Sequence, residues 1–193
     1  MNDRWHQSVL LEEAVEALIV SSNGVYLDGT FGGGGHSQHI LERLSPIGAL
    51  MAFDRDPAAQ AIASELSRKD NRFAFKATKF SRLGLYVQPR SLDGVLLDLG
   101  ISSPQIDNPS RGFSFSRSGP LDMRMDPGDG ESAAEWLAVA SERDISDVLR
   151  KFGEERFARR IAKAIIKERS SEPIITTRRL AEIISAANPS WEQ

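Results

Sequence analysis

The sequence predicts an α/β protein, with a Rossmann-like parallel β-sheet in its first half followed by a part made only of helices. Three observations favour this fold. Short apolar runs alternate with helical patterns through the first hundred residues, as in βα units. A glycine-rich segment, residues 29–35, follows the first of these runs and precedes a helical pattern. From Ser132 onward, the spacing of apolar residues is helical alone.

The expected sheet has four strands, each a short apolar run: residues 25–27, 49–53, 73–75 and 94–98. A helix is expected after the first strand, where Ile40, Leu41 and Leu44 have helical spacing. Another helix is expected to begin at Pro57, because proline suits the first turn of a helix. Since all four strands are apolar, we expect the sheet to be covered on both faces.

The composition changes after residue 104. Residues 106–130 carry Pro, Ser and Gly and are too polar for a central strand, so we expect a long loop of the kind that is typically functional or mobile. Helical patterns follow at residues 133–137, 145–149, 157–165 and 180–184. We therefore divide the chain into residues 1–105, the domain that contains the sheet, and residues 106–193, a loop and helical domain.

The fourth strand raises a packing problem. In a doubly wound sheet whose order reverses at the first strand, the fourth strand forms an open apolar edge, and such edges promote aggregation. We expect this edge to be covered, either by strands that follow Gln193 or by another chain, as in a homodimer.

Composition excludes several classes of protein. The 193 residues hold no cysteine, which excludes disulfides, thiolate metal sites and a catalytic thiol. No apolar stretch approaches the roughly 18 residues of a membrane helix, and the N-terminus lacks the pattern of a signal peptide, so we expect a cytoplasmic protein. The net charge of −3 argues against a chain that is basic throughout, although it permits a local basic face.

The glycine-rich segment and Asp54 predict a site for a nucleoside. Glycine lets a ligand approach the backbone, and free N–H groups at the start of the next helix favour polar or anionic ligand atoms. Asp54 ends the second strand, 22 residues after Gly32, where Rossmann-like folds place an acid that accepts hydrogen bonds from ribose hydroxyls. The alternatives are a merely flexible turn for the glycines and a helix cap for Asp54.

The glycine spacing narrows the choice of ligand. A dinucleotide-binding G-x-G-x-x-G motif is absent, because its third glycine would fall on Ser37 or Gln38. A phosphate-binding P-loop is also absent, since no lysine follows a glycine. The remaining pattern suits a ligand with a ribose and a short charged tail but no pyrophosphate, and S-adenosylmethionine is such a ligand.

Polar residues follow the fourth strand at the same edge of the sheet. Asp98, Ser102, Ser103 and Gln105 supply an acid, two hydroxyls and an amide in the crevice where open α/β sheets bind ligands. A methyl donor and its acceptor could meet there. The alternative is an ordinary turn built from the serines and Pro104.

Seven segments together resemble the bacterial 16S ribosomal RNA (cytosine-N4) methyltransferase family: residues 6–14, 26–32 with 34–37, 54–57, 97–105, 111–115, 119–126 and 153–158. The resemblance covers essentially the whole chain and implies a class I methyltransferase domain with a helical domain inserted after the fourth strand. Members of that family are longer, and their chain returns from the insertion to complete the sheet. The resemblance therefore implies a parallel sheet that is incomplete at its C-terminal side.

The resemblance also implies a cofactor site. The expected contacts with S-adenosylmethionine are made by seven residues that have the family's residue type: Gly34, Gly35, His36, Asp54, Phe80, Asp98 and Gln105. From the residues alone, Phe80 packs either on an adenine or in the core. His36 and His39 have a spacing that suits metal ligands on a helix, but with His6 as the only third histidine and no cysteine we expect no metal.

The activity that the resemblance implies is methyl transfer from S-adenosylmethionine to the N4 amine of a cytidine in 16S ribosomal RNA of the small ribosomal subunit. Such direct transfer needs no covalent intermediate, whereas methylation of carbon 5 of a pyrimidine uses a cysteine, which this chain lacks. Asp98, with Ser103 and nearby carbonyls, is the expected acceptor of the amine protons, or else Asp98 only holds the cofactor. The alternatives are a methyltransferase of another nucleic-acid amine, an inactive cofactor- or RNA-binding fragment and, more distantly, a dehydrogenase.

The helical half contains a basic region. Residues 143–179 hold eleven Lys and Arg against six Asp and Glu, a net charge of +5. Arg156, Arg160, Lys163 and Lys167 align on one face of a predicted helix. This row either binds RNA phosphates or is a solvated helix face.

The long loop carries a second set of candidate RNA contacts. The arginines Arg111, Arg117 and Arg124 are interleaved with Phe113 and Phe115. Such a set can grip RNA or stack on a flipped base. Alternatively, these side chains fold back onto the protein.

Overall fold

The computed structural model describes residues 10–114 and 116–188, and the chain divides into two compact units. The first unit runs from Met1 to Ser102 and the second from Ser103 to Gln193, whereas the boundary expected from the sequence lies after Gln105. Across the described ranges, no helix is long and apolar enough to cross a membrane.

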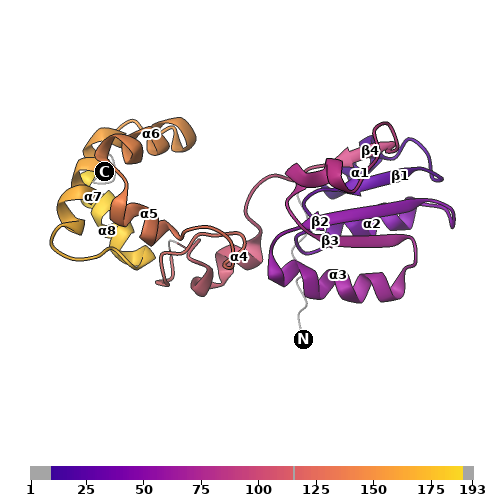
Figure 1. Cartoon of the computed structure of the whole chain (residues 1–193), viewed down its shortest axis with the longest axis horizontal. Helices are drawn as coiled ribbons and strands as arrows, with labels where there is room; N and C mark the ends of the chain where they lie inside the picture. Colours follow the sequence, from indigo (N-terminus) through magenta and orange to yellow (C-terminus); the bar gives the residue numbers. More distant parts are fainter. Residues whose placement is uncertain (1–9, 115, 189–193) are drawn as a thin grey trace. The chain divides into compact units, whose positions relative to one another are not determined.

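The first unit contains a parallel four-stranded sheet (Figure 1). Its strands are β1 (Val25–Asp28), β2 (Ala49–Asp54), β3 (Phe73–Ala77) and β4 (Gly94–Leu96), in the order β3-β2-β1-β4. The predicted Rossmann-like fold is confirmed, and the carboxyl ends of all four strands meet at one edge of the sheet. β4 lies at the side edge of this sheet, as expected, and what covers it stays a prediction.

Three helices, α1 (Leu11–Leu18), α2 (Gly35–Arg43) and α3 (Pro57–Lys69), pack on one face of the sheet. Their buried side chains form one core with Tyr26, Leu50 and Phe73, which the strand register places side by side. α3 begins at Pro57, as predicted, and the carboxylate of Asp56 caps it by accepting the N–H of Ala58. The sequence pattern did not indicate α1.

The opposite face is only partly covered within the first unit. Phe53 is buried there and contacts Tyr86 edge-on, with ring centroids 5.5 Å apart. Tyr86 follows η1 (Phe80–Leu85), a short 3-10 helix. Near β4, Val25 and Val95 are 39% and 44% exposed. Within the first unit this part of the face is exposed, because the crossover from β3 to β4 contains a 3-10 helix in place of a longer α-helix, and its cover stays a prediction.

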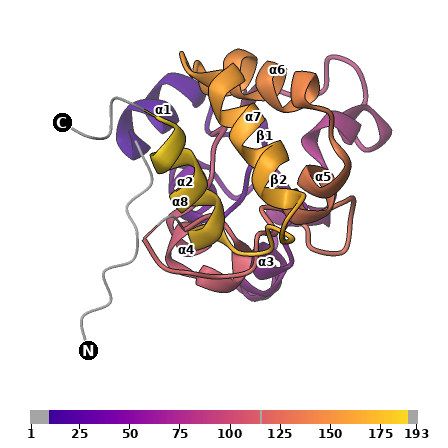
Figure 2. The ribbon, with the colours of Figure 1, turned by 90° about the vertical axis from the view of Figure 1, so that its left-hand side faces the viewer.

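The second unit is helical (Figure 2). Its elements are α4 (Ser103–Asp107), η2 (Pro109–Arg111), α5 (Ala133–Val139), α6 (Glu142–Gly153), α7 (Ala158–Arg169) and α8 (Thr177–Ala187). The four helices predicted after Ser132 are confirmed, and α7 packs against both α6 and α8 around an apolar core. Side-chain caps from Ser132, Ser141 and Thr176 fix the starts of α5, α6 and α8.

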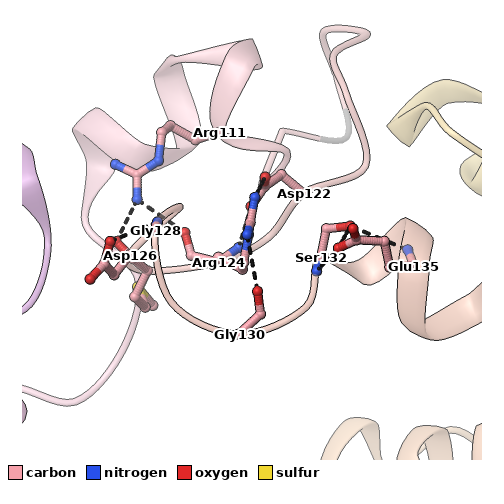
Figure 3. Close-up of polar contacts among 9 residues, drawn as sticks. Arg111, Asp122, Arg124, Asp126, Gly128, Gly130, Ser132 and Glu135 are labelled. Carbon is pink, nitrogen blue, oxygen red and sulfur yellow. Dashed lines mark hydrogen bonds and ion pairs between the residues drawn. The ribbon is translucent and has the colours of Figure 1, made fainter.

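Polar contacts shape the segment between η2 and α5 (Figure 3). The guanidinium of Arg124 donates to both carboxylate oxygens of Asp122, at 2.9 and 2.6 Å, and to the carbonyl of Gly130 at 3.0 Å. Arg111 donates to the carbonyls of Arg124 and Met125, at 3.1 and 2.8 Å. The side chains of Arg111 and Arg124 thus hold the backbone of residues 124–130 in place.

We predict that Asp122→Asn destabilises the protein by about 1 kcal/mol at neutral pH, because the exchange removes a partly solvent-screened ion pair. The hydrogen bonds from Arg124 hold the pKa of Asp122 below its ordinary value. The contribution of the pair is therefore present above the unfolded-state pKa, near 3.9, and is lost as pH falls through the folded-state pKa.

Urea unfolding at a series of pH values tests this prediction. The difference in unfolding free energy between the parent and Asp122→Asn should shrink from neutral pH toward strongly acid pH. Asp147→Asn, at an exposed ion pair with Arg150, is the matched control and should have a smaller effect. A difference that stays constant over the whole pH range would contradict the role assigned to the Asp122 charge.

Candidate functional site

The glycine-rich loop between β1 and α2 forms one wall of the candidate site. Gly32 and Gly34 have φ angles of 53° and 80°, in the left-handed region that favours glycine. A Cβ on Gly34 would also lie 2.7 Å from Cζ of Phe31, a ring buried in the core. A Cβ on Gly33, by contrast, would meet no atom within 4 Å. The loop therefore rests on Phe31 and has open space beside Gly33.

Asp54 connects this loop to the end of β2. Its Oδ2 accepts the N–H of Gly32 at 2.7 Å, and its Oδ1 accepts the N–H of Asp56 at 2.9 Å. The helix cap is Asp56, so the alternative interpretation of Asp54 as the cap is wrong. An ionised carboxylate has about four acceptor positions, and two of them remain for further donors such as hydroxyl groups.

Asp28 is a fully buried carboxyl group at the end of β1. It accepts the hydroxyl of Ser37 at 2.7 Å and the N–H of Thr30 at 3.0 Å. Burial raises the pKa of Asp28, because the ionised form loses its hydration. The Oγ1 of Thr30 accepts the N–H of Asp98 at 2.7 Å. A chain of hydrogen bonds thus links the start of α2, the end of β1 and the residues after β4.

His36 and Asp98 face each other across this loop. Nδ1 of His36 lies 3.8 Å from Oδ2 of Asp98, and the two side chains are 7% and 51% exposed. Nε2 of His36 is buried and has no hydrogen-bond partner among the described residues. Because buried polar atoms are normally hydrogen-bonded, this nitrogen favours a polar ligand at the site. Asp98 remains accessible to a second molecule.

Phe80 lies at the same edge of the sheet. It begins η1 and is 40% exposed. A Cβ on Gly29 would lie 2.5 Å from Cδ2 of Leu97 and 3.1 Å from Cβ of Phe80, so the ends of β1 and β4 and the start of η1 converge. Six of the seven predicted residues therefore belong to one group at the strand ends of the first unit: Gly34, Gly35, His36, Asp54, Phe80 and Asp98.

Gln105 belongs to the second unit, where it lies in α4 and is buried. Its contact with a cofactor stays a prediction, as do the contacts of the six residues in the first unit. The side chain of Ser103, the expected helper of Asp98, is outside the described part of the chain, and so is Phe115. Sequence reasoning missed the supporting roles of Asp28, Thr30 and Ser37. All three lie in the segment 26–32 with 34–37 that carried the resemblance, which was the only signal for them.

His39 does not act together with His36. Its Nε2 lies 3.0 Å from Glu12 and its Nδ1 lies 3.0 Å from Glu42, so that His39 connects α2 to α1. The hydrogen bond from His39 lowers the pKa of Glu12. Over the described ranges, the structure contains no cluster of three or more side chains that could hold a metal ion.

The loop arginines have structural partners. Arg111 and Arg124 close the turn shown in Figure 3. The guanidinium of Arg117 donates to the carbonyl of Asp107 at 3.3 Å, and Phe113 is half-buried. These contacts favour the interpretation in which the loop folds back on itself over the interpretation in which it grips RNA.

Comparisons with known proteins find relatives over almost the whole chain. Residues 3–193 match the model of the MraW methylase family. The chain is 58% identical, over 99% of its length, to the ribosomal RNA small subunit methyltransferase H of Chromohalobacter salexigens, and covers 58% of that protein. It is 57% identical, over 97% of its length, to the protein of the same name from Thioalkalivibrio sulfidiphilus, and covers 61% of it.

The chain thus spans about three fifths of the length of the curated relatives it matches. A crystal structure of a provisionally assigned rRNA methylase from Clostridium thermocellum aligns with 39% of this chain and 44% of its own, at 15% identity and a TM-score of 0.36.

We predict that Thr30→Val loosens the backbone at Asp98, because valine has the shape of threonine but cannot accept the N–H of Asp98. Losing one hydrogen bond of this kind costs about 1 kcal/mol, so the amide hydrogen of Asp98 should exchange about fivefold faster. Residue-resolved hydrogen exchange measures this effect. Thr30→Ser keeps the oxygen and is the matched control. Equal protection of Asp98 in Thr30→Val and in the parent would disprove the link.

Proposed function

The chain belongs to the MraW methylase family, and on that premise we propose that its first unit binds S-adenosylmethionine and supplies the transfer site of a ribosomal RNA methyltransferase. The proposed reaction is methylation of the exocyclic N4 amine of a cytidine in 16S ribosomal RNA of the small subunit, in the cytoplasm. The observation that carries the proposal is the contact of 2.7 Å between Gly32 and Asp54, which joins the glycine-rich loop and the acid at the crevice between β1 and β2.

The residues present fit S-adenosylmethionine. Asp54 retains two acceptor positions, which suits the two hydroxyls of a ribose. The first turn of α2 has no side-chain cap, so its N–H groups and the unpartnered Nε2 of His36 offer polar contacts. The open space beside Gly33 accepts a ligand, and the 40% exposed ring of Phe80 offers an apolar surface. When bound, this cofactor supplies an electrophilic methyl group on a sulfonium ion.

Asp98 is the proposed acceptor for the amine. The lone pair of the N4 nitrogen forms the new N–C bond while the C–S bond breaks. The electron pair of the broken C–S bond stays on sulfur. One proton then leaves the nitrogen for the carboxylate of Asp98 or for water. Asp98 is half-exposed and its backbone is held by Thr30, so it can meet an incoming base from a fixed position. No thiol is needed for this step, in agreement with a chain that has no cysteine.

The RNA substrate is supported by the two relatives, whose printed name is ribosomal RNA small subunit methyltransferase H. We assign RNA recognition to the second unit, because its residues 143–179 carry a net charge of +5. Methyl transfer onto small-subunit RNA, compared with DNA, distinguishes this proposal from a methyltransferase of another nucleic-acid amine. Binding of S-adenosylmethionine without any transfer would support the alternative of an inactive cofactor-binding fragment.

We predict that Asp54→Asn weakens S-adenosylmethionine binding about 10- to 100-fold, because hydrogen bonds to a charged acceptor contribute roughly 1.5–3 kcal/mol. Titration calorimetry on the full chain measures this affinity. Asp56→Asn is the matched control. It removes the same charge two residues away and leaves a residue that caps α3 equally well. Absence of binding heat for the parent chain, or equal affinities of the two variants, would count against the proposed site.

Asp98→Asn should lower the rate of methyl transfer by about 100-fold or more, the usual contribution of a positioned proton acceptor. Transfer of a labelled methyl group to small-subunit RNA measures the rate, and calorimetry measures cofactor affinity in parallel. A slower rate at unchanged affinity assigns Asp98 to the amine, whereas weakened affinity assigns it to the cofactor. Unchanged rate and unchanged affinity together would remove Asp98 from both roles.

A further inference from the structure

The exposed face of α7 carries a row of cations, and Arg156, two residues before the helix, precedes this row in the chain. Arg156, Arg160, Lys163 and Lys167 are all exposed and make no ion pair with other described residues. Each residue of a helix turns the chain by about 100°, so Arg160, Lys163 and Lys167 lie within roughly 60° of arc on α7. This arc is opposite the buried side chains of α7. The row is therefore a continuous line of positive charge at the surface of the second unit.

Several other cations of the second unit already have polar partners within it. Arg150 pairs with Asp147 at 2.7 Å, and Arg179 pairs with Glu168. Arg169 donates to two backbone carbonyls. Because the row lacks such partners, its like charges repel one another and gain most from an anion that comes from outside.

An exposed aromatic ring lies near one end of the row. Phe152, at the end of α6, is 83% exposed, and it precedes Arg156 by four residues. Four residues of chain span at most about 14 Å, which limits the distance between Phe152 and Arg156. The ring is therefore within reach of an RNA strand bound along the row of cations. Within α7, the part of the row from Arg160 to Lys167 is about 10 Å long, at 1.5 Å per residue. Cations that track a backbone, with an aromatic ring on which a base can stack, are the features that bind single-stranded RNA.

We propose that Phe152, Arg156, Arg160, Lys163 and Lys167 form a basic face that binds single-stranded RNA. The cations contact successive phosphates, and Phe152 stacks on one base. This inference rests on the proposed function and adds to it, because it names the surface that holds the RNA and the unpaired form in which the RNA is bound.

The first test neutralises two cations of the row. Binding of a labelled oligocytidylate to the full chain is measured over a range of salt concentrations. Lys163→Gln with Lys167→Gln should flatten the slope of log K against log salt by about 1.4, since each phosphate contact with a single strand contributes roughly 0.7. At about 0.1 M salt this corresponds to a loss of roughly 25-fold in affinity. Arg68→Gln with Lys69→Gln, on exposed positions of α3, removes the same charge and is the matched control.

The second test separates stacking from charge. Phe152→Leu should weaken oligocytidylate binding about fivefold or more and leave the salt slope unchanged, because it removes the ring but no charge. Phe152→Tyr keeps the ring and should bind like the parent. The ring is exposed, so neither exchange should disturb folding. A duplex RNA of the same length should bind more weakly and respond little to Phe152→Leu.

The outcomes separate this inference from the proposed function. Equal salt slopes for the α7 and α3 variants would overturn the RNA-binding face. So would competition experiments in which polyglutamate displaces the labelled oligocytidylate as effectively as unlabelled oligocytidylate does. If that happens while S-adenosylmethionine still gives binding heat, only the surface is wrong. If the cofactor gives no heat either, the proposed function fails independently of the surface.

Discussion

The hydrogen bond from the N–H of Gly32 to Asp54 is the contact on which the geometry of the candidate site depends. It ties the loop after β1 to the end of β2 with an ionisable acceptor, which makes it stronger than a bond between neutral groups. On the other side of the loop, the buried carboxyl of Asp28 holds Thr30 and Ser37. The loop is thus held from two directions by carboxylates of the chain itself, so binding of the proposed nucleoside would cost little free energy in ordering it.

The sheet was predictable because each strand is a short apolar run that alternates with helical spacing. Two elements of the first unit gave no such signal. α1 has only eight residues and starts after Leu10, whose φ of 51° is left-handed and whose side chain cannot cap a helix. η1 is a 3-10 helix without buried residues, so it has no apolar face of the 3.6-residue period. α1 is set by the packing of Val15 in the core of the first unit more than by local preference.

The site was predictable where spacing along the chain carries the information. An acid at the end of the second strand, after a glycine-rich turn, pointed to Asp54 from the sequence alone. The bond between Thr30 and the N–H of Asp98 was not predictable, because its partners are 68 residues apart and only the parallel pairing of β1 with β4 brings them together. The same limit applies to Arg124. Its charge permits an RNA contact or an ion pair, and the position of Asp122 decides between them.

Whether a cation is available to RNA depends on its partners more than on the count of charges. The whole chain has a net charge of −3, but residues 143–179 have a net charge of +5. Within these residues, Arg150 and Arg179 already form ion pairs with Asp147 and Glu168. A paired arginine that moves to a phosphate must first leave a carboxylate, so its net gain is small. Lys163 and Lys167 leave no partner behind. They exchange only mobile counterions for a phosphate, which is the favourable part of nucleic-acid binding. On this argument, an RNA backbone gains more from Lys163 and Lys167 than from the paired Arg150 and Arg179.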